Sequence, residues 1–165
     1  MQQHVALAGV LVFGACLVSS PASSQTATTD FNVQITITAE CQIDSATDLD
    51  FGSSGIIAAA VTATSEITVQ CTNGTPYDLA LNAGIGTGAT VAARLMTGPN
   101  SETVQYSLYQ DAGHADVWGD TIGTDTVADT GTGSPQAFTV FGQVPAQPTP
   151  QAGTYVDTVT ATLTY

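Results

Sequence analysis

The chain ends on Thr158-Val159-Thr160-Ala161-Thr162-Leu163-Thr164-Tyr165, a stretch in which threonine alternates with apolar residues. Alternation with a period of two places one row of side chains on each face of a β-strand. The stretch is therefore predicted to be a strand with one apolar face. Because it runs to the final residue, we expect its edge to stay uncovered, and an uncovered apolar edge aggregates unless something pairs with it.

A second stretch, close to the start of the chain, has the same alternation. Its polar positions are Asn32, Gln34, Thr36 and Thr38, and its apolar positions are Phe31, Val33, Ile35 and Ile37. A polar leader, residues 25–30, precedes it. This segment is predicted to be a strand that can pair with an edge on another copy, and the two matched ends indicate a chain built to polymerise.

Residues 1–24 have the features of a secretory signal peptide. An apolar run over residues 5–18 is followed by Ser19-Ser20-Pro21-Ala22, a small-residue cleavage region. The run is too short to span a membrane as a helix. The positions before it contain His4 but no Lys or Arg. The alternative is a lipoprotein acylated at Cys16.

Export and cleavage leave a short N-terminal segment and one domain. Cleavage after Ala22 and cleavage after Ser24 both fit the sequence. We expect residues 25–38 to form the segment and residues 39–165 to form a domain large enough for a real core.

Two cysteines remain after cleavage, Cys41 and Cys71. An even pair in an exported chain predicts a disulfide. It would close a loop of about 30 residues and stabilise the fold by roughly 3–4 kcal/mol in the chain-entropy model. The alternative is two buried free thiols. Metal binding is disfavoured because no second ligand pair lies nearby in the sequence.

The charge balance is extreme. The chain has one Lys or Arg, which is Arg94, and 14 Asp and Glu, for a net charge of −13. Such a surface repels nucleic acid and anionic lipid, so no nucleic-acid partner is expected. Hydrophobic residues make up 43% of the chain, which is not the composition of a disordered acidic tail.

Further short alternating stretches lie between the two ends, separated by clusters of Gly, Asn, Pro and Asp. They occur at residues 67–71, 77–81, 104–108 and 138–140. Short strands with regular turn signals predict an all-β antiparallel sandwich. Residues 56–63 fit a short helix or a strand, and residues 111–133 are expected to be a long irregular surface loop.

Two acidic groups of residues are candidate chemical sites. Asp44, Asp48 and Asp50 form one acidic group, and a second contains Asp111, His114, Asp116 and Asp120. Carboxylates bind Ca²⁺ through oxygen, but this spacing matches no calcium loop and solvated turns explain it better. No nucleophile motif accompanies His114. We therefore expect no enzyme activity, no cofactor and no metal.

The ordered set of short motifs resembles the spore coat protein U domain family, which includes pilins of the archaic (Csu-type) chaperone–usher pathway. The motifs span about residues 31–165. They are Ala39-Glu40-Cys41-Gln42-Ile43, Leu49-Asp50-Phe51-Gly52, Val69-Gln70-Cys71-Thr72-Asn73-Gly74, Arg94-Leu95-Met96, Tyr106-Ser107-Leu108-Tyr109-Gln110-Asp111, Trp118-Gly119-Asp120, Val140-Phe141-Gly142-Gln143-Val144-Pro145 and Gly153-Thr154-Tyr155-Val156-Asp157-Thr158-Val159.

The resemblance implies an immunoglobulin-like antiparallel β-sandwich that lacks its final strand. In such pilins a periplasmic chaperone lends a strand to the gap, and at the outer-membrane usher the N-terminal strand of the next subunit replaces it. The implied donor strand is Phe31, Val33, Ile35 and Ile37. The implied acceptor edge, which is also the chaperone-binding edge, is Val159, Ala161, Leu163 and Tyr165.

The expected function is that of a secreted structural pilus subunit at the cell surface, supporting adhesion and biofilm formation. Its expected partners are a periplasmic chaperone, an usher and neighbouring pilin subunits. Two alternatives stay open: a monomeric module that holds carbohydrate on aromatic residues such as Trp118, and a spore or cyst coat component. The N-terminal strand separates the pilin from the module, because a module would fold that strand into its own sheet.

Overall fold

The computed structural model describes residues 23–165. Most of the predicted signal peptide, Cys16 included, therefore lies outside the described residues. The chain divides into two units, Met1–Ile35 and Thr36–Tyr165. Residues 23–35 of the first unit belong to no strand or helix and are exposed. All the strands of the described part lie in the second unit.

The second unit is built from strands and one short 3₁₀ turn, Pro99–Ser101. The strands are β1 (Cys41–Ala46), β2 (Val61–Cys71), β3 (Pro76–Leu81), β4 (Arg94–Thr97), β5 (Thr103–Tyr109), β6 (Val127–Thr130), β7 (Gln136–Val144) and β8 (Ala161–Thr164). Threonine, valine and aromatic residues are frequent in them, as expected for half-buried pleated surfaces.

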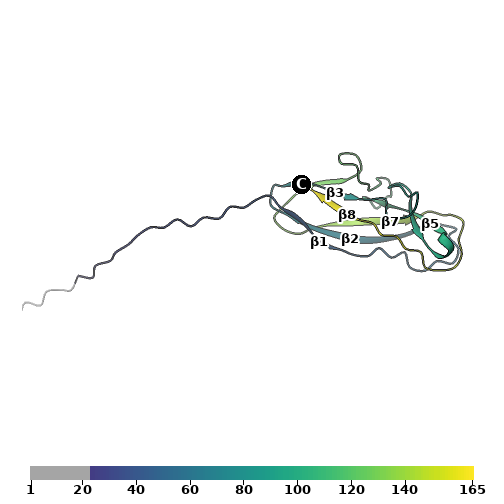
Figure 1. Ribbon diagram of the computed structural model, residues 1–165, viewed down its shortest axis with the longest axis horizontal. Coiled ribbons are helices and arrows are strands. Elements are labelled where there is room, and N and C mark those ends of the chain that lie inside the picture. Colours follow the sequence, from purple (N-terminus) through teal and green to yellow (C-terminus); the bar gives the residue numbers. More distant parts are fainter. Residues whose placement is uncertain (1–22) are drawn as a thin grey trace, which may run out of the picture. The chain divides into compact units, whose positions relative to one another are not determined.

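These strands form two antiparallel sheets. The larger has the order β1-β2-β7-β5-β4, and the smaller has the order β6-β3-β8. In Figure 1, β8 is the yellow strand and lies beside its partner β3. The all-β sandwich predicted from the sequence is confirmed.

The core lies between the inner faces of the sheets. The alternating stretches predicted as strands supply it: Ile67 and Val69 from β2 and Leu79 and Leu81 from β3 are all buried. Trp118 is buried as well, and its indole N–H donates to the Leu79 carbonyl (2.8 Å). Within residues 23–165 no helix is long and apolar enough to cross a membrane.

Three local expectations need correction. The helical alternative for residues 56–63 is wrong, because residues 61–63 begin β2 and the rest is irregular. The expected loop at residues 111–133 contains β6, which pairs with β3. Residues 158–160 are not part of the last strand, which begins at Ala161. The chain pairs with β4 at Val156 and next pairs at Thr160, with Asn82 just after β3, so residues 158–160 lie in the passage between the two sheets.

Arg94, the single basic side chain, is fully buried at one end of the sandwich. Its guanidinium donates to four backbone carbonyls: Asn82 (2.8 Å, from Nε), Val91 (2.7 Å), Leu81 (2.9 Å) and Trp118 (2.8 Å). Burial lowers the pKa of Arg94 from its ordinary value. The carbonyl dipoles compensate the guanidinium for its lost hydration. The side chain thereby ties both ends of the connection between β3 and β4, at Asn82 and Val91, to Trp118.

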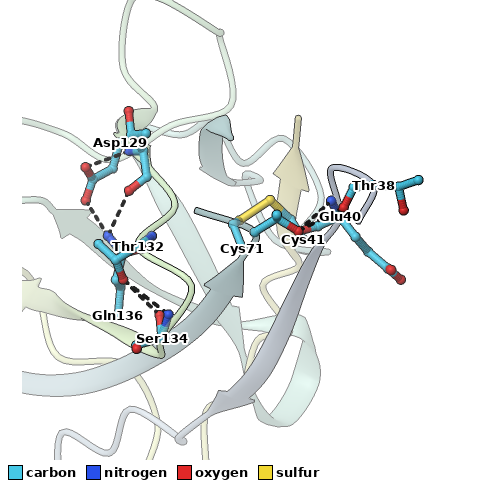
Figure 2. The surroundings of a disulfide bond; sticks show 10 residues. Thr38, Glu40, Cys41, Cys71, Asp129, Thr132, Ser134 and Gln136 are labelled. Carbon is cyan, nitrogen blue, oxygen red and sulfur yellow. Dashed lines mark hydrogen bonds between the residues drawn. A yellow bond between two sulfur atoms is a disulfide. The ribbon is translucent and has the colours of Figure 1, made fainter. Parts of the chain in front are cut away.

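The predicted disulfide is confirmed: Cys41 at the start of β1 is bonded to Cys71 at the end of β2. Figure 2 shows this bond with Thr38 and Glu40 close to it. It ties the edge strand of the larger sheet to its neighbour where the N-terminal segment joins the domain.

The disulfide leads to a first prediction. The intact exported protein should have a mass two hydrogens below that of the reduced chain. Reduction should lower its unfolding free energy by roughly 3–4 kcal/mol, because the closed loop restricts the unfolded state. Mass spectrometry and thermal unfolding with and without reductant check both parts, and two alkylatable thiols in the native protein would overturn the assignment.

Candidate functional site: an apolar groove beside an unpaired strand edge

The outer edge of β8 has no partner among the described strands, since β8 pairs with β3 alone. The Thr160 carbonyl accepts the Asn82 N–H (3.1 Å), so the backbone of Thr160 is directed toward β3. Backbone groups of successive residues in an antiparallel strand are directed to alternate sides. The N–H and C=O groups of Ala161 and Leu163 are therefore directed to the open side.

A second free edge faces this one across the sandwich. β1 pairs only with β2 in the described part, and β1 and β8 approach each other. Beyond β1 the chain continues as residues 47–51, whose Leu49 and Phe51 fold back over β7. Gly142 makes this possible: a Cβ there would lie 2.7 Å from Leu49 Cδ1 and 3.0 Å from Phe51 Cζ.

Between the two edges lies a groove of about 650 Å³. One wall is formed by residues 46–51 and the other by residues 154–159 with Ala161. Its floor consists of core side chains reached from the open side: Ile67, Leu81, Met96, Tyr106, Leu108 and Val140. The groove thus has an apolar floor and walls of mixed polarity, beside a row of unpaired backbone groups.

The wall at residues 154–160 is held by side-chain hydrogen bonds. Asp157 Oδ2 accepts the hydroxyl of Tyr106 (2.8 Å), and its Oδ1 accepts the N–H groups of Ile85 and Thr158 (both 2.8 Å). The Asn82 side chain accepts the Thr160 N–H (2.9 Å). These bonds fix the wall together with the backbone pairing of Val156 with Thr97 at the end of β4.

Tyr106 joins the two walls across the floor. It receives Phe51 edge-on, with ring centroids 6.2 Å apart, and donates its hydroxyl to Asp157. Burial, followed by the bond to Asp157, raises the pKa of Tyr106 well above its ordinary value. The hydroxyl therefore stays protonated and remains a donor at physiological pH.

The predicted acceptor residues differ in their surroundings. Val159 and Ala161 line the groove, Leu163 is half-buried against the core, and Tyr165 is exposed.

Sequence reasoning did not identify the facing wall at residues 46–51 or the Tyr106–Asp157 bond. The family motifs Leu49-Asp50-Phe51-Gly52 and Tyr155-Val156-Asp157 were the available signal for them.

The predicted donor residues are exposed and belong to no strand. Phe31 is 84%, Val33 86%, Ile35 82% and Ile37 69% accessible. Four large apolar side chains in one exposed row are unusual for a soluble surface, where such residues are scattered.

Asp111, His114 and Trp118 make structural contacts. Within residues 23–165 no group of three or more His, Cys, Asp or Glu is placed to hold a metal ion. Asp111 accepts the N–H groups of Asp116 (2.8 Å) and Ala115 (3.0 Å), bonds that lower its pKa. The His114 ring packs edge-on against Tyr109. Trp118 is buried and does not offer a face to a sugar.

Residues 27–162 match the family model described as Spore Coat Protein U domain. The chain is 30% identical to Protein U of Myxococcus xanthus over 174 aligned positions, covering 97% of both proteins.

A solved structure is similar as well. The chain aligns with a TM-score of 0.55 and 26% identity to a chain of the CsuC-CsuE chaperone-tip adhesion subunit pre-assembly complex from archaic chaperone-usher Csu pili of Acinetobacter baumannii. The alignment covers 79% of this chain and only 40% of the other.

The geometry of β8 leads to a second prediction. In freshly refolded, dilute protein, before it aggregates or assembles, the amides of Ala161 and Leu163 should exchange with solvent at least tenfold faster than those of Thr162 and Thr164, because only the latter are directed toward β3. Residue-resolved hydrogen exchange by NMR measures this alternation. Uniform protection along β8 would mean that its outer edge is already covered.

Proposed function

The chain belongs to the spore coat protein U domain family, and on that premise we propose that it is an exported structural subunit that polymerises into a surface pilus. The N-terminal strand of one copy fills the groove of the next, after a periplasmic chaperone has held the groove. The observation that carries this proposal is the apolar groove beside the unpaired edge of β8.

The donor segment and the groove complement each other chemically. Phe31, Val33, Ile35 and Ile37 share one face, and the groove floor is apolar. Burying each side chain would contribute about 1.5–3 kcal/mol before ordering costs. Backbone groups of the added strand would pair with those of Ala161 and Leu163, as in other cases of β-strand addition.

The geometry of such an assembly sets its form. The donor and the acceptor are different surfaces of one chain, so each contact is head-to-tail, and repetition gives an open fibre. The similarity to a chain of a chaperone–subunit complex from archaic pili supports a chaperone and an usher as partners. It also supports export through the periplasm to the cell surface, with adhesion and biofilm formation as the role of the fibre.

A second candidate function is assembly into a spore or cyst coat. The family description and the end-to-end match with Protein U of Myxococcus xanthus favour it. The genes beside this one separate the two: an adjacent chaperone and usher support the pilus, and their absence supports the coat.

The third prediction concerns chaperone dependence. A domain without residues 25–38 keeps its open groove and exposed edge, and such surfaces aggregate. We expect its soluble periplasmic yield to depend on co-expression of a dedicated chaperone. Fractionation of cells with and without that chaperone measures it, and a stable monomer made without any partner would contradict it.

The fourth prediction tests the donor strand. Ile35→Asp should abolish fibres, because its carboxylate would have to be buried in the groove without a partner, at a cost of several kcal/mol. Thr36→Asp, whose side chain faces the opposite side, should be mild. Electron microscopy of fibre length measures both.

The subunit itself should still fold with its chaperone in both variants, because residues 31–37 form no part of the sandwich. Fibres of normal length from Ile35→Asp, or equal effects of the two substitutions, would refute the donor-strand role.

A further inference from the structure

The junction between the N-terminal segment and the domain is held by one side chain, Thr72. Its Oγ1 donates toward the carbonyls of Thr38 (3.1 Å) and Glu40 (3.3 Å) and accepts the Glu40 N–H (3.2 Å). The Thr72 N–H also donates to the Glu40 carbonyl (2.9 Å). The bonds between Glu40 and Thr72 continue the β1–β2 pairing by one residue pair beyond the disulfide, and Figure 2 shows Thr38 and Glu40 beside that bond.

The same junction lies at the end of the sandwich where β8 ends. Cys41 is paired with Cys71, and residues 72–75 then turn into β3. β8 pairs with β3 in a register that places Thr164 opposite Asp78, so the last residues of β8 lie beside the start of β3. The groove is lined by the far end of β1, at Ala46, and by the start of β8, at Ala161, so β1 runs from the junction toward the groove.

Because β1 leads from the junction toward the groove, the donor strand could also insert into the groove of its own chain. A reversal at Ala39 and Glu40 would be a two-residue hairpin turn, the commonest connection between antiparallel strands. It would send residues 31–37 into the chain's own groove, antiparallel to β1 and parallel to β8. An intramolecular partner has an effective concentration of about millimolar, far above that of another subunit. Self-insertion would therefore outcompete polymerisation unless something opposes the reversal.

We propose that Thr72 is a positioning residue that opposes it. By holding Thr38 and Glu40 in line with β1, its hydroxyl keeps the donor strand out of the subunit's own groove and available to a neighbour. The Cys41–Cys71 bond fixes the adjacent pair, so residues 38–40 can reverse only by breaking the bonds to Thr72. This inference rests on the proposed donor-strand function.

The experiment compares three full-length variants, exported together with the chaperone and usher. Thr72→Val removes the hydroxyl and keeps the shape, Thr72→Ser keeps the hydroxyl, and Thr64→Val makes the same change at an exposed position of β2. Each carries a photo-crosslinking phenylalanine analogue at position 35. Crosslinks to residues 159–165 are scored by mass spectrometry as within one chain or between two chains.

Thr72→Val should raise the ratio of intrachain to interchain crosslinks by about tenfold, with correspondingly fewer fibres, because it loses two or three hydrogen bonds. Thr72→Ser and Thr64→Val should resemble the wild type. The ratio is measured on soluble, disulfide-bonded protein, so a general loss of stability lowers both kinds of crosslink and leaves the ratio unchanged.

The possible outcomes separate this inference from the function beneath it. An unchanged ratio in Thr72→Val, with interchain crosslinks present, overturns the role of Thr72 and leaves donor-strand exchange standing. The absence of any crosslink from position 35 to residues 159–165 overturns both. A raised ratio that Thr72→Ser does not share supports the role of the hydroxyl.

Discussion

The need to satisfy backbone hydrogen bonds at the edge of β8 governs the rest of this structure. The amide and carbonyl groups of Ala161 and Leu163 are directed away from β3, next to a trough of core side chains. Buried backbone groups must be paired, so this edge is stable only while water reaches it or another strand covers it. A trough filled by an apolar strand excludes water, and the same strand then supplies the missing bonds. The two requirements therefore select one kind of occupant, an extended segment with alternating apolar side chains.

Packing holds one wall of the groove in place, and hydrogen bonds hold the other. Leu49 and Phe51 pack over Gly142 on one side, and Asp157 fixes the opposite side through Tyr106 and Ile85. Arg94 contributes indirectly, because it holds the carbonyl of Asn82, whose side chain in turn accepts the Thr160 amide. The chain has a single Lys or Arg, and this cation stabilises backbone inside the sandwich, so the 14 acidic side chains have no Lys or Arg available on the surface.

The sequence predicted those features that depend on local pattern. Alternation at residues 67–71 and 77–81 identified the buried strands β2 and β3, and the cysteine count with export identified the Cys41–Cys71 bond. It did not predict features that depend on long-range pairing. β6 has a weak pattern of its own and is a strand because β3 lies beside it. The wall at residues 46–51 is defined by packing on β7 and by hydrogen bonds between Thr47 and Glu66 of β2. The alternation of residues 158–165 predicted a longer strand than β8. The alternation of apolar residues cannot indicate where the chain stops pairing with β4 and starts pairing with β3.

Under the proposed function, one chain carries both the groove and the strand that fills it, so the strand has to enter a neighbouring copy in preference to its own groove. Intramolecular insertion is favoured by effective concentration, while contact between two copies is opposed by their like charges of −13, a repulsion that salt partly screens. Both effects act against polymerisation, so affinity between strand and groove is not sufficient to make a fibre. Something must constrain the direction in which residues 31–37 leave the domain. In the proposed mechanism, the disulfide and the bonds of Thr72 act on residues 38–41, directly after the donor segment, where the backbone path would decide between a closed monomer and an open fibre.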